Sequence, residues 1–438
     1  MRRIDTRTDR RIVLKTLGSK LRVLHFAPRV CWPLDTGAKL RNYHLARVLS
    51  RRAQVTLLAF GDEVGDDALL PESPENFYDQ IVAVKRAPGY TPSKILRGAL
   101  GRTPLSLLNY TTEAMRQALG NTLNEHVFNI VQVESIHLMA YLPALRAARS
   151  RPLVICDWHN IESELMQRYS ERERSFLRQK YARRTARQLS VLEQRASHDF
   201  DAHLTVSDRD RQRLLQLNPA AKAFVIENGV DSAQYSDGQI EKAYAAWHSR
   251  NDSRSPRILF VGSMDYHANI GGVVDFAREV WPSLHDSRPE LLFTIVGRDP
   301  ATEVRELRSI AGIEVTGTVD DVRPYYREAI AAIVPLKVGG GSRLKILEAM
   351  AAGVPVVSTT LGAEGLAVQN GENILLANKN QELAEAIIRL VESDAEREQL
   401  RSGGRALVSS RYEWSGLGAA LFETYSQLLN TRSASSNQ

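Results

Sequence analysis

The residues most able to do chemistry stand together in one stretch, Gly339-Gly340-Gly341-Ser342-Arg343-Leu344-Lys345-Ile346-Leu347-Glu348. The glycines allow a tight backbone turn, and Ser342 is a favourable N-cap for a helix that follows. Apolar residues recur at helical spacing at Leu344, Leu347 and Ala351, and Gly353 comes before Pro355. We therefore expect a glycine turn, a helix that ends at Gly353, and then a buried strand over 354–359.

The two cations of this helix stand where the helix itself disfavours them. Arg343 and Lys345 fall in the first turn, where unpaired amide groups already create a positive field, so each costs about 0.3–1 kcal/mol. A bound anion turns this cost of the two cations into a favourable contribution. The turn residues Gly340, Gly341 and Ser342, together with the two cations, thus predict a phosphate or diphosphate site.

Glu348 lies on the same helical face as Lys345, three residues further on. Its carboxylate suits hydrogen bonds from sugar hydroxyls next to the phosphates. A different interpretation makes Lys345 and Glu348 an ordinary surface pair at a solvated helix end, but it leaves the glycines without a role. The turn is not a Walker A loop, because no Gly-Lys-Ser or Gly-Lys-Thr closes it.

This stretch resembles the nucleotide-sugar motif of the retaining GT-B glycosyltransferases of family 4, the group 1 transferases. Glu348 matches the second glutamate of the family's Glu-x7-Glu pattern, which implies a contact to the nucleotide's ribose. Gly340 stands in place of the first glutamate. The variant Gly-x-Arg-x-Lys-x-x-x-Glu resembles an exopolysaccharide-type subgroup, and the resemblance runs from Leu21 to about Leu429.

The resemblance also points to residues in the first half of the chain. Gly37 matches the family's N-terminal glycine loop, although the same spacing fits an ordinary strand-to-helix turn. Ligands of open α/β sheets bind beyond the carboxyl ends of strands, which singles out Glu134 and His159 as well. Many family members carry a histidine where this chain has Glu134. Both residues are candidate catalytic groups, beside Arg343 and Lys345, and each would equally suit a structural role.

Three further loops of the second half are candidates for donor binding. The loop after the strand 257–261 contains Gly262 and Ser263. Most family members carry an arginine and a lysine in this loop, which bind the diphosphate, but here those two positions are Ser263 and Ala268. We hypothesise that Arg343 and Lys345 supply the charge that this loop lacks. The resemblance assigns Val319 to the nucleobase and places Gly362 in the donor site.

Metal and cofactor binding are not indicated by the sequence. Asp320 and Asp321 look like a metal pair, but they come directly before a helix, where acids are favoured as caps. Cys31 and Cys156 have no metal-ligand spacing and cannot form a disulfide framework. We expect no metal and no cofactor, with a nucleotide-diphosphate sugar as co-substrate.

Composition sets broad limits on compartment and partners. The chain has 438 residues, 43% of them hydrophobic and 25% charged, which is typical of globular proteins. It has no apolar run long enough to span a bilayer and no signal-peptide core, so we expect a cytoplasmic protein. The net charge of +6 favours acidic partners.

The basic stretch 168–195 reads as one long helix with nine Arg or Lys and three Glu. Such a stretch is usually a solvated helix face. It also suits a peripheral contact with an anionic membrane on the inner side of the cell. Its few aromatic residues form no stacking platform, and the chain contains no nucleic-acid-binding module, so we expect no nucleic-acid partner.

Strands and helices alternate along the chain, which predicts an α/β protein with doubly wound sheets. With the resemblance, the expected fold is GT-B: two Rossmann-like domains facing a cleft, with a C-terminal helix that crosses back to the first domain. The expected parts are a basic extension (1–20), an acceptor-side domain (21–235), a linker (236–256), a nucleotide-sugar-binding domain (257–410) and the returning helix (411–430).

The function we expect is a retaining hexosyltransferase that moves a sugar from a nucleotide-diphosphate sugar to a carbohydrate or lipid-linked acceptor in cell-surface polysaccharide synthesis. A second hypothesis is a catalytically silent nucleotide-sugar-binding scaffold of a polysaccharide assembly complex. The missing first glutamate favours that alternative. Donor hydrolysis without acceptor separates the two, since a scaffold has none. The sequence does not name the base, the sugar or the acceptor.

Overall fold

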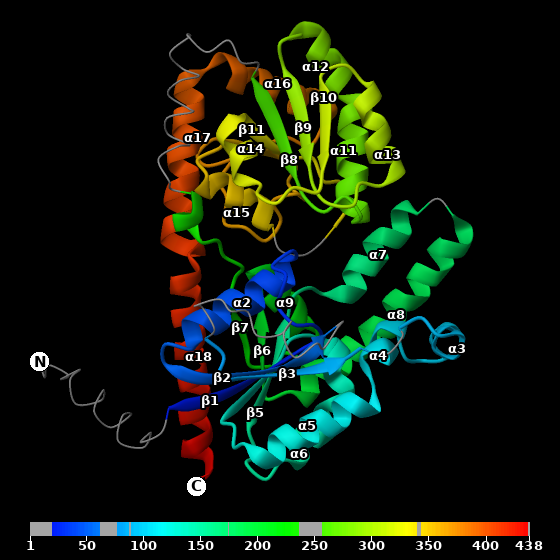
Figure 1. The fold of residues 1–438 in the computed structure, drawn as a ribbon, viewed down its shortest axis with the longest axis vertical. Coiled ribbons are helices and arrows are strands. Elements are labelled where there is room, and N and C mark those ends of the chain that lie inside the picture. Colours follow the sequence, from blue (N-terminus) through cyan, green and yellow to red (C-terminus); the bar gives the residue numbers. More distant parts are fainter. Residues whose placement is uncertain are drawn as a thin grey trace, which may run out of the picture. The chain divides into compact units, whose positions relative to one another are not determined.

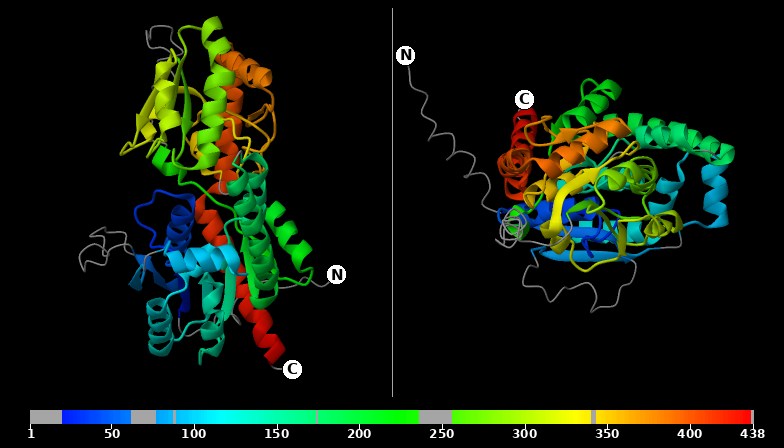
Figure 2. Two further views of the ribbon diagram at one scale, coloured as in Figure 1. Left: turned by 90° about the vertical axis from the view of Figure 1, so that its right-hand side faces the viewer. Right: turned by 90° about the horizontal axis from the view of Figure 1, so that it is seen from above.

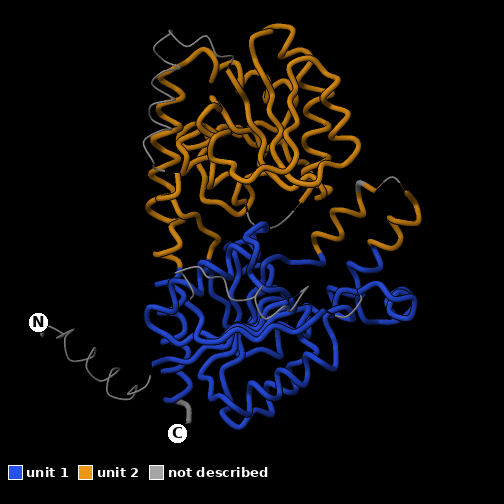
Figure 3. The backbone as a smooth tube through the Cα atoms, viewed as in Figure 1, with its two compact units in different colours: residues 1–163, 183–226, 418–438 blue, residues 164–182, 227–417 orange. Residues whose placement is uncertain are grey.

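The structure is a computed structural model, and it describes residues 20–61, 77–86, 89–173, 175–235, 256–339 and 343–436. The expected extension and linker therefore fall almost entirely outside the described residues, as do Gly340, Gly341 and Ser342. The chain forms two compact units, coloured in Figure 3. Unit 1 contains residues 1–163, 183–226 and 418–438, and unit 2 contains residues 164–182 and 227–417.

Unit 1 is built on a parallel seven-stranded sheet of order β3-β2-β1-β4-β5-β6-β7. Its strands are β1 (Leu21–Ala27), β2 (Ala53–Gly61), β3 (Gln80–Lys85), β4 (Ile130–Val133), β5 (Leu153–Trp158), β6 (Ala202–Thr205) and β7 (Ala223–Val225). The central strands are buried along their whole length, as expected for a sheet covered on both faces.

Helices connect these strands, as Figure 1 shows. They are α2 (Gly37–Leu49), α3 (Pro92–Leu100), α4 (Leu105–Tyr110), α5 (Glu113–Glu125), the 3₁₀ turn η1 (Ile136–Tyr141), α6 (Leu142–Ala147), α7 (Glu162–Arg172), α8 (Phe176–Asp199) and α9 (Asp208–Leu217). Helix α7 and the first turns of α8 are counted with unit 2.

Unit 2 repeats this architecture with a parallel six-stranded sheet of order β10-β9-β8-β11-β12-β13. The strands are β8 (Arg257–Val261), β9 (Leu292–Val296), β10 (Ile313–Gly317), β11 (Ala329–Val334), β12 (Val356–Ser358) and β13 (Leu375–Leu376). The helical segments are η2 (Ser232–Tyr235), α11 (His267–Glu279), α12 (Trp281–Ser287), α13 (Thr302–Arg305), η3 (Glu306–Ser309), α14 (Arg323–Glu328), α15 (Leu344–Ala351), α16 (Asn380–Glu392), α17 (Asp394–Leu407) and η4 (Val408–Tyr412).

The predicted pair of doubly wound sheets is confirmed, and the strand orders fix where ligands can bind. In unit 1 the order reverses between β1 and β4, and in unit 2 between β8 and β11. The loops after these strands diverge to opposite faces, which opens a crevice at the carboxyl edge of each sheet. Glu134 follows β4 and Gly262 follows β8, so two of the predicted site residues lie at these switch points.

The basic stretch 168–195 is not one helix, contrary to prediction. Helix α7 ends at Arg172, and α8 begins at Phe176. The Glu173 side chain explains the break, because its Oε1 accepts from the backbone N–H of Ser175 at 2.9 Å and so ends the regular ladder. Gln179 then ties α8 to α7 through the carbonyl of Ser170 at 3.1 Å.

The C-terminal helix α18 (Trp414–Ser436) returns to unit 1, as predicted. Figure 2 shows it as one continuous red helix that ends at the C-terminus. One apolar face of α18 is buried, and it comprises Trp414, Leu417, Leu421, Tyr425 and Leu428. At Gly418 an added Cβ would lie 2.5 Å from the Cβ of Val48 in α2, so this glycine lets the two helices approach closely. Among the described residues, no helix has the length and hydropathy needed to cross a bilayer.

Replacing Leu421 by alanine tests how far unit 1 depends on α18. Leu421 is fully buried, so the truncation removes apolar contacts and leaves a cavity, and we expect a loss of about 2–5 kcal/mol in unfolding free energy. Chemical denaturation followed by circular dichroism measures this loss. The matched control is Gln427→Ala at an exposed position of the same helix, which should change stability by less than about 0.5 kcal/mol. Equal midpoints for the two variants would contradict the assigned packing.

Candidate active site

The ammonium group of Lys345 in unit 2 occupies a niche between α15 and the loop that follows β8. Its Nζ donates to Asn269 Oδ1 at 2.6 Å and lies 4.2 Å from the ring centroid of Phe260. Asn269 in turn donates from Nδ2 to the carbonyl of Ser263 at 2.8 Å. A Cβ on Gly262 would lie 2.9 Å from Nζ, closer than such atoms pack, so the glycine makes room for the cation. The structure thus brings Lys345, Gly262 and Ser263 together.

Burial is the main influence on Lys345. Burial and, to a smaller extent, the charge of Arg343 lower the pKa of this ammonium while Glu348 raises it, and the resulting pKa is about 7. In the free protein the group is therefore about half charged near neutral pH. An anion placed beside Nζ would favour the charged form and raise the pKa again.

Arg343 takes the N-cap position of α15, ahead of the first helical residue Leu344. Its side chain is buried, and Nη2 donates to the carbonyl of Leu361 at 2.8 Å and lies 3.9 Å from Glu364 Oε2. Glu364 also forms a bidentate pair with Arg168, with distances of 2.8 and 3.1 Å. This part of unit 2 therefore holds two arginines around one carboxylate at the start of α15.

Glu348 lies one turn further along α15, next to two tyrosines that the sequence did not single out. Tyr326 donates to Glu348 Oε2 at 3.4 Å, and Tyr235 packs edge-on against Tyr326 with ring centroids 6.0 Å apart. Burial raises the pKa of Glu348, while the Tyr326 hydrogen bond and Lys345 lower it. The carboxylate is thus presented among groups that can also bond to hydroxyls.

The structure places a cation that was not predicted, Arg298, beside Ser263. Arg298 follows β9, and its Nε donates to Ser263 Oγ at 3.0 Å. Ser263 Oγ also donates to Asp265 Oδ1 at 2.7 Å. Arg298 and Asn269 were not predicted; Arg298 reaches the site from the loop after β9, and Asn269 from the first turn of α11. The only signal in the sequence for Arg298 was its position directly after Gly297, where a buried strand ends.

The remaining predicted residues of unit 2 have few contacts that bear on their predicted roles. Val319 is half-buried in the loop after β10, where no described contact tests its assignment to a nucleobase. Gly362 lies close to the end of β11, since a Cβ there would be 2.6 Å from the carbonyl oxygen of Val334. Asp321 accepts from the backbone N–H of Arg323 at 2.9 Å just before α14, but the N-cap of that helix is Val322, so the acid bonds to the first turn without being the cap residue.

Unit 1 contains a pocket of about 280 Å³ at the carboxyl ends of β1, β4 and β5. Glu134 and His159 line it, as does Lys39, and Gly37 begins α2 between two lining residues. The other lining residues are Pro28, Arg29, Thr36, Ala38, Asn42, Tyr110, Ser135, Ile136, His137, Trp158, Asn160 and Glu162. The mixture of charged, amide and aromatic side chains suits a polyhydroxylated ligand.

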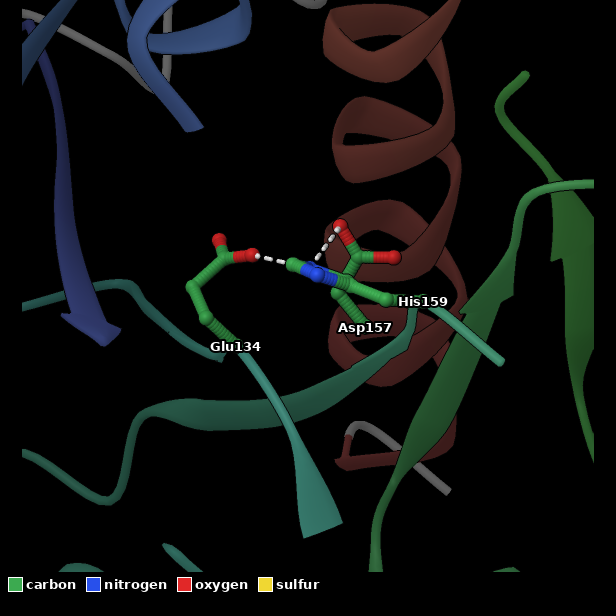
Figure 4. A group of neighbouring side chains, drawn as sticks. All are labelled: Glu134, Asp157 and His159. Carbon is green, nitrogen blue, oxygen red and sulfur yellow. Dashed lines mark hydrogen bonds and ion pairs between the residues drawn. The ribbon is translucent and has the colours of Figure 1, made fainter. Parts of the chain in front are cut away.

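Glu134 and His159 contact each other on the wall of this pocket, as Figure 4 shows. His159 Nε2 lies 3.1 Å from Glu134 Oε2 and 3.9 Å from Asp157 Oδ2. The three side chains have the donor types of a metal site, and their nearest atoms lie within 4.8 Å of one another. However, Arg41 already makes a bidentate pair with Asp157, with its Nε 2.8 Å from that same Oδ2. A second cation would have to displace or repel this guanidinium, so the donor set does not fit a metal ion.

The pKa values of Glu134 and Asp157, the two buried carboxylates next to His159, shift in opposite directions. Burial works to raise the pKa of Glu134, but His159, His25 and Arg41 outweigh it and lower that pKa. Burial raises the pKa of Asp157 despite Arg41. Glu134 is thus the carboxylate that stays ionised most readily.

Gln132 links these acids to the C-terminal helix. Its Nε2 donates to Glu134 Oε1 at 2.6 Å, and its Oε1 accepts from the hydroxyl of Tyr425 in α18. The return of α18 therefore fixes the orientation of Glu134 as well as the packing of unit 1.

Matches to known families agree with this geometry. Residues 255–393 match the family described as "Glycosyl transferases group 1", and residues 36–229 match the "Glycosyl transferase 4-like domain". Together the two matches span most of both described units.

Curated relatives are similar over part of their length. A phosphatidyl-myo-inositol mannosyltransferase of Mycobacterium leprae is 30% identical over 178 residues, which are 38% of this chain and 46% of the relative. An uncharacterized 44.6 kDa protein in the cps region of Klebsiella pneumoniae is 23% identical over 184 residues, 40% of this chain and 47% of the relative. This chain thus spans about half the length of these relatives.

Solved structures share the fold over nearly the whole chain. A sucrose-phosphate synthase from Thermosynechococcus elongatus has a TM-score of 0.70 at 17% identity, covering 94% of this chain and 100% of that one. Anabaena HepE, solved in complex with UDP and glucose, has a TM-score of 0.65 at 18% identity, covering 93% and 100%. The fold is GT-B, and the two family matches show that the chain belongs to the group 1 glycosyltransferases, family 4, a retaining family.

Proposed function

We propose that the protein transfers a sugar from a nucleotide-diphosphate sugar to a carbohydrate or lipid-linked acceptor, with retention of configuration and without a metal. The observation that carries the proposal is the partly buried ammonium of Lys345 at the N-terminal end of α15. A partly buried amine in contact with an amide oxygen, an aromatic face and a glycine is poised to receive an anion.

The reaction breaks the bond between the anomeric carbon and the diphosphate oxygen. Negative charge then accumulates on the departing diphosphate, so hydrogen-bond donors directed at it lower the barrier most. Lys345, the amide groups that begin α15 and Arg343 are assigned this role. The acceptor oxygen bonds to the anomeric carbon on the same face, and its proton passes to the leaving phosphate. Glu348 is assigned to the ribose, Val319 to the base, and Gly262, Ser263 and Gly362 to the donor site.

The unit 1 pocket is assigned to the acceptor or to the transferred sugar. Glu134 accepts hydrogen bonds readily because its carboxylate stays ionised, and His159 beside it supplies a donor. Together they suit neighbouring hydroxyls of a sugar. The similarity to a protein of a cps region supports a role in polysaccharide synthesis, and HepE supports a UDP-sugar as the first donor to test.

Location at the inner face of the cell membrane is part of the same proposal. Helix α8 begins with the cations Arg178, Lys180, Arg183, Arg184 and Arg187 and has no acid before Glu193. Such a run favours contact with anionic headgroups.

A catalytically silent nucleotide-sugar-binding scaffold is the second candidate. Gly340 in place of the family's first glutamate favours it, since a donor-sugar contact is missing from the chain. Thermal-shift screening with UDP-, GDP- and ADP-sugars identifies the donor, because binding raises apparent stability. Slow hydrolysis of that donor without acceptor supports the transferase, and binding with no hydrolysis and no transfer supports the scaffold.

Lys345→Ala should lower kcat for donor hydrolysis by about 30- to 1000-fold, corresponding to the roughly 2–4 kcal/mol lost on removing a charge-stabilising donor. Initial rates at saturating donor measure the effect. The matched control is Lys379→Ala in the same unit, whose side chain is 81% exposed, and its rate should equal the wild-type rate. Activity of Lys345→Ala within threefold of wild type would remove Lys345 from the mechanism.

Donor binding should take up a proton. The free ammonium has a pKa of about 7, and the bound diphosphate raises it, so affinity should fall as pH rises above 7, by at most about tenfold per pH unit. The diphosphate of an intact nucleotide sugar does not titrate in this range. Calorimetry at pH 7 in two buffers of different ionisation enthalpy should show uptake of roughly half a proton.

The matched control for this measurement is Lys345→Met, which should bind more weakly and take up no proton near pH 7. Equal proton uptake by the variant and the wild type would assign the titration to another group.

A further inference from the structure

Helix α3 in unit 1 turns its large apolar side chains outward. Ile95, Leu96 and Leu100 have exposed fractions of 46%, 60% and 75%, and Tyr90 just before the helix is 74% exposed. The residues of α3 at positions 95, 96, 99 and 100 share one face at helical spacing. Bulky apolar groups gathered on one exposed helical face indicate an interaction surface.

The opposite side of α3 is fixed to the unit by small residues and backbone groups. A Cβ on Gly98 would lie only 3.1 Å from the Cβ of Leu105, so the glycine allows α3 to pack closely on α4. Gln188 of α8 donates to the carbonyls of Gly98 and Gly101 at 2.9 and 2.8 Å, and Arg184 donates to Gly101 at 2.7 Å. Since the helix is anchored through its carbonyls and Gly98, its outward apolar face is a stable feature of unit 1.

The charged residues of α3, its flanking segments and the adjoining part of α8 are positively charged. The segment 86–112 contains Arg86, Lys94, Arg97 and Arg102 and no Asp or Glu. The neighbouring part of α8 in unit 1 adds the exposed Arg183, Arg184 and Arg187. Figures 1 and 2 show α3 at the outer edge of unit 1 beside α8. Within the described residues of α3 and the adjoining part of α8, the charged side chains are cations, and an apolar face beside cations is complementary to an apolar layer covered by anions.

We propose that α3 docks unit 1 on an anionic lipid bilayer, with Ile95, Leu96 and Leu100 inserted at the level of the headgroups and the surrounding arginines and lysine on lipid phosphates. A helix of this kind lies in the interfacial plane and combines buried apolar area with attraction to anionic lipid. Helix α3 lies outside the basic stretch 168–195, which adds Arg183, Arg184 and Arg187 to the same surface. The inference deepens the membrane location in the proposed function, and the docking does not depend on the transfer reaction.

Vesicle sedimentation of the full chain tests the proposal. The vesicles contain phosphatidylcholine alone or with roughly one third phosphatidylglycerol. Wild type should bind the anionic vesicles, lose most of this binding at about 0.5 M salt, and bind neutral vesicles at least about tenfold more weakly. The variant Ile95→Ser/Leu96→Ser/Leu100→Ser should lose at least about tenfold in partition coefficient to anionic vesicles, since three apolar side chains no longer insert.

Two controls separate this surface from general effects. Val127→Ser changes an apolar side chain of unit 1 that is 60% exposed and lies outside α3, and it should bind like wild type. Donor hydrolysis by the triple variant should also equal that of wild type, which shows that the site is intact and keeps the test independent of the proposed function.

Three outcomes would overturn the proposal. In the first, the triple variant binds anionic vesicles like wild type. In the second, wild type binds neither kind of vesicle, or both equally. In the third, the triple substitution changes the oligomeric state in light scattering without changing vesicle binding, which would make α3 a contact between copies of this chain.

Discussion

The structure of unit 2 depends on holding the ammonium group of Lys345 in a partly buried position where, among the described residues, no carboxylate forms an ion pair with it. Lys345 Nζ contacts an amide oxygen and an aromatic face, and the absence of a side chain at Gly262 leaves it room. Burial of an unneutralised cation is costly, and the lowered pKa of Lys345 expresses that cost. Such an arrangement is unfavourable in the free protein and becomes favourable once an anion arrives, which is the property a leaving-group site needs.

The cations of this site come from several elements rather than from one loop. Lys345 and Arg343 belong to α15, and Arg298 reaches Ser263 from the end of β9. The hypothesis that charge has moved from the loop after β8 to α15 therefore describes only part of the arrangement, because Arg298 keeps a guanidinium next to that loop.

Local patterns in the sequence predicted the fold well. The strand β8 has the predicted bounds, Gly353 follows the end of α15 with a φ of +72°, and the returning C-terminal helix is present as α18. These features depend on neighbouring residues and on periodicity. Asn269, Arg298 and Tyr326 were missed because they join the site from residues 76, 35 and 22 positions away from their partners. The break between α7 and α8 was missed because one side chain, that of Glu173, competes with the helical ladder.

A crystal structure of the protein with the intact nucleotide sugar shows whether the diphosphate binds at the start of α15. A diphosphate oxygen should then lie within about 3 Å of Lys345 Nζ, with Arg343 directed at the same group. This placement of the diphosphate is contradicted if both side chains lie more than about 8 Å from the phosphorus atoms, where salt screens their attraction.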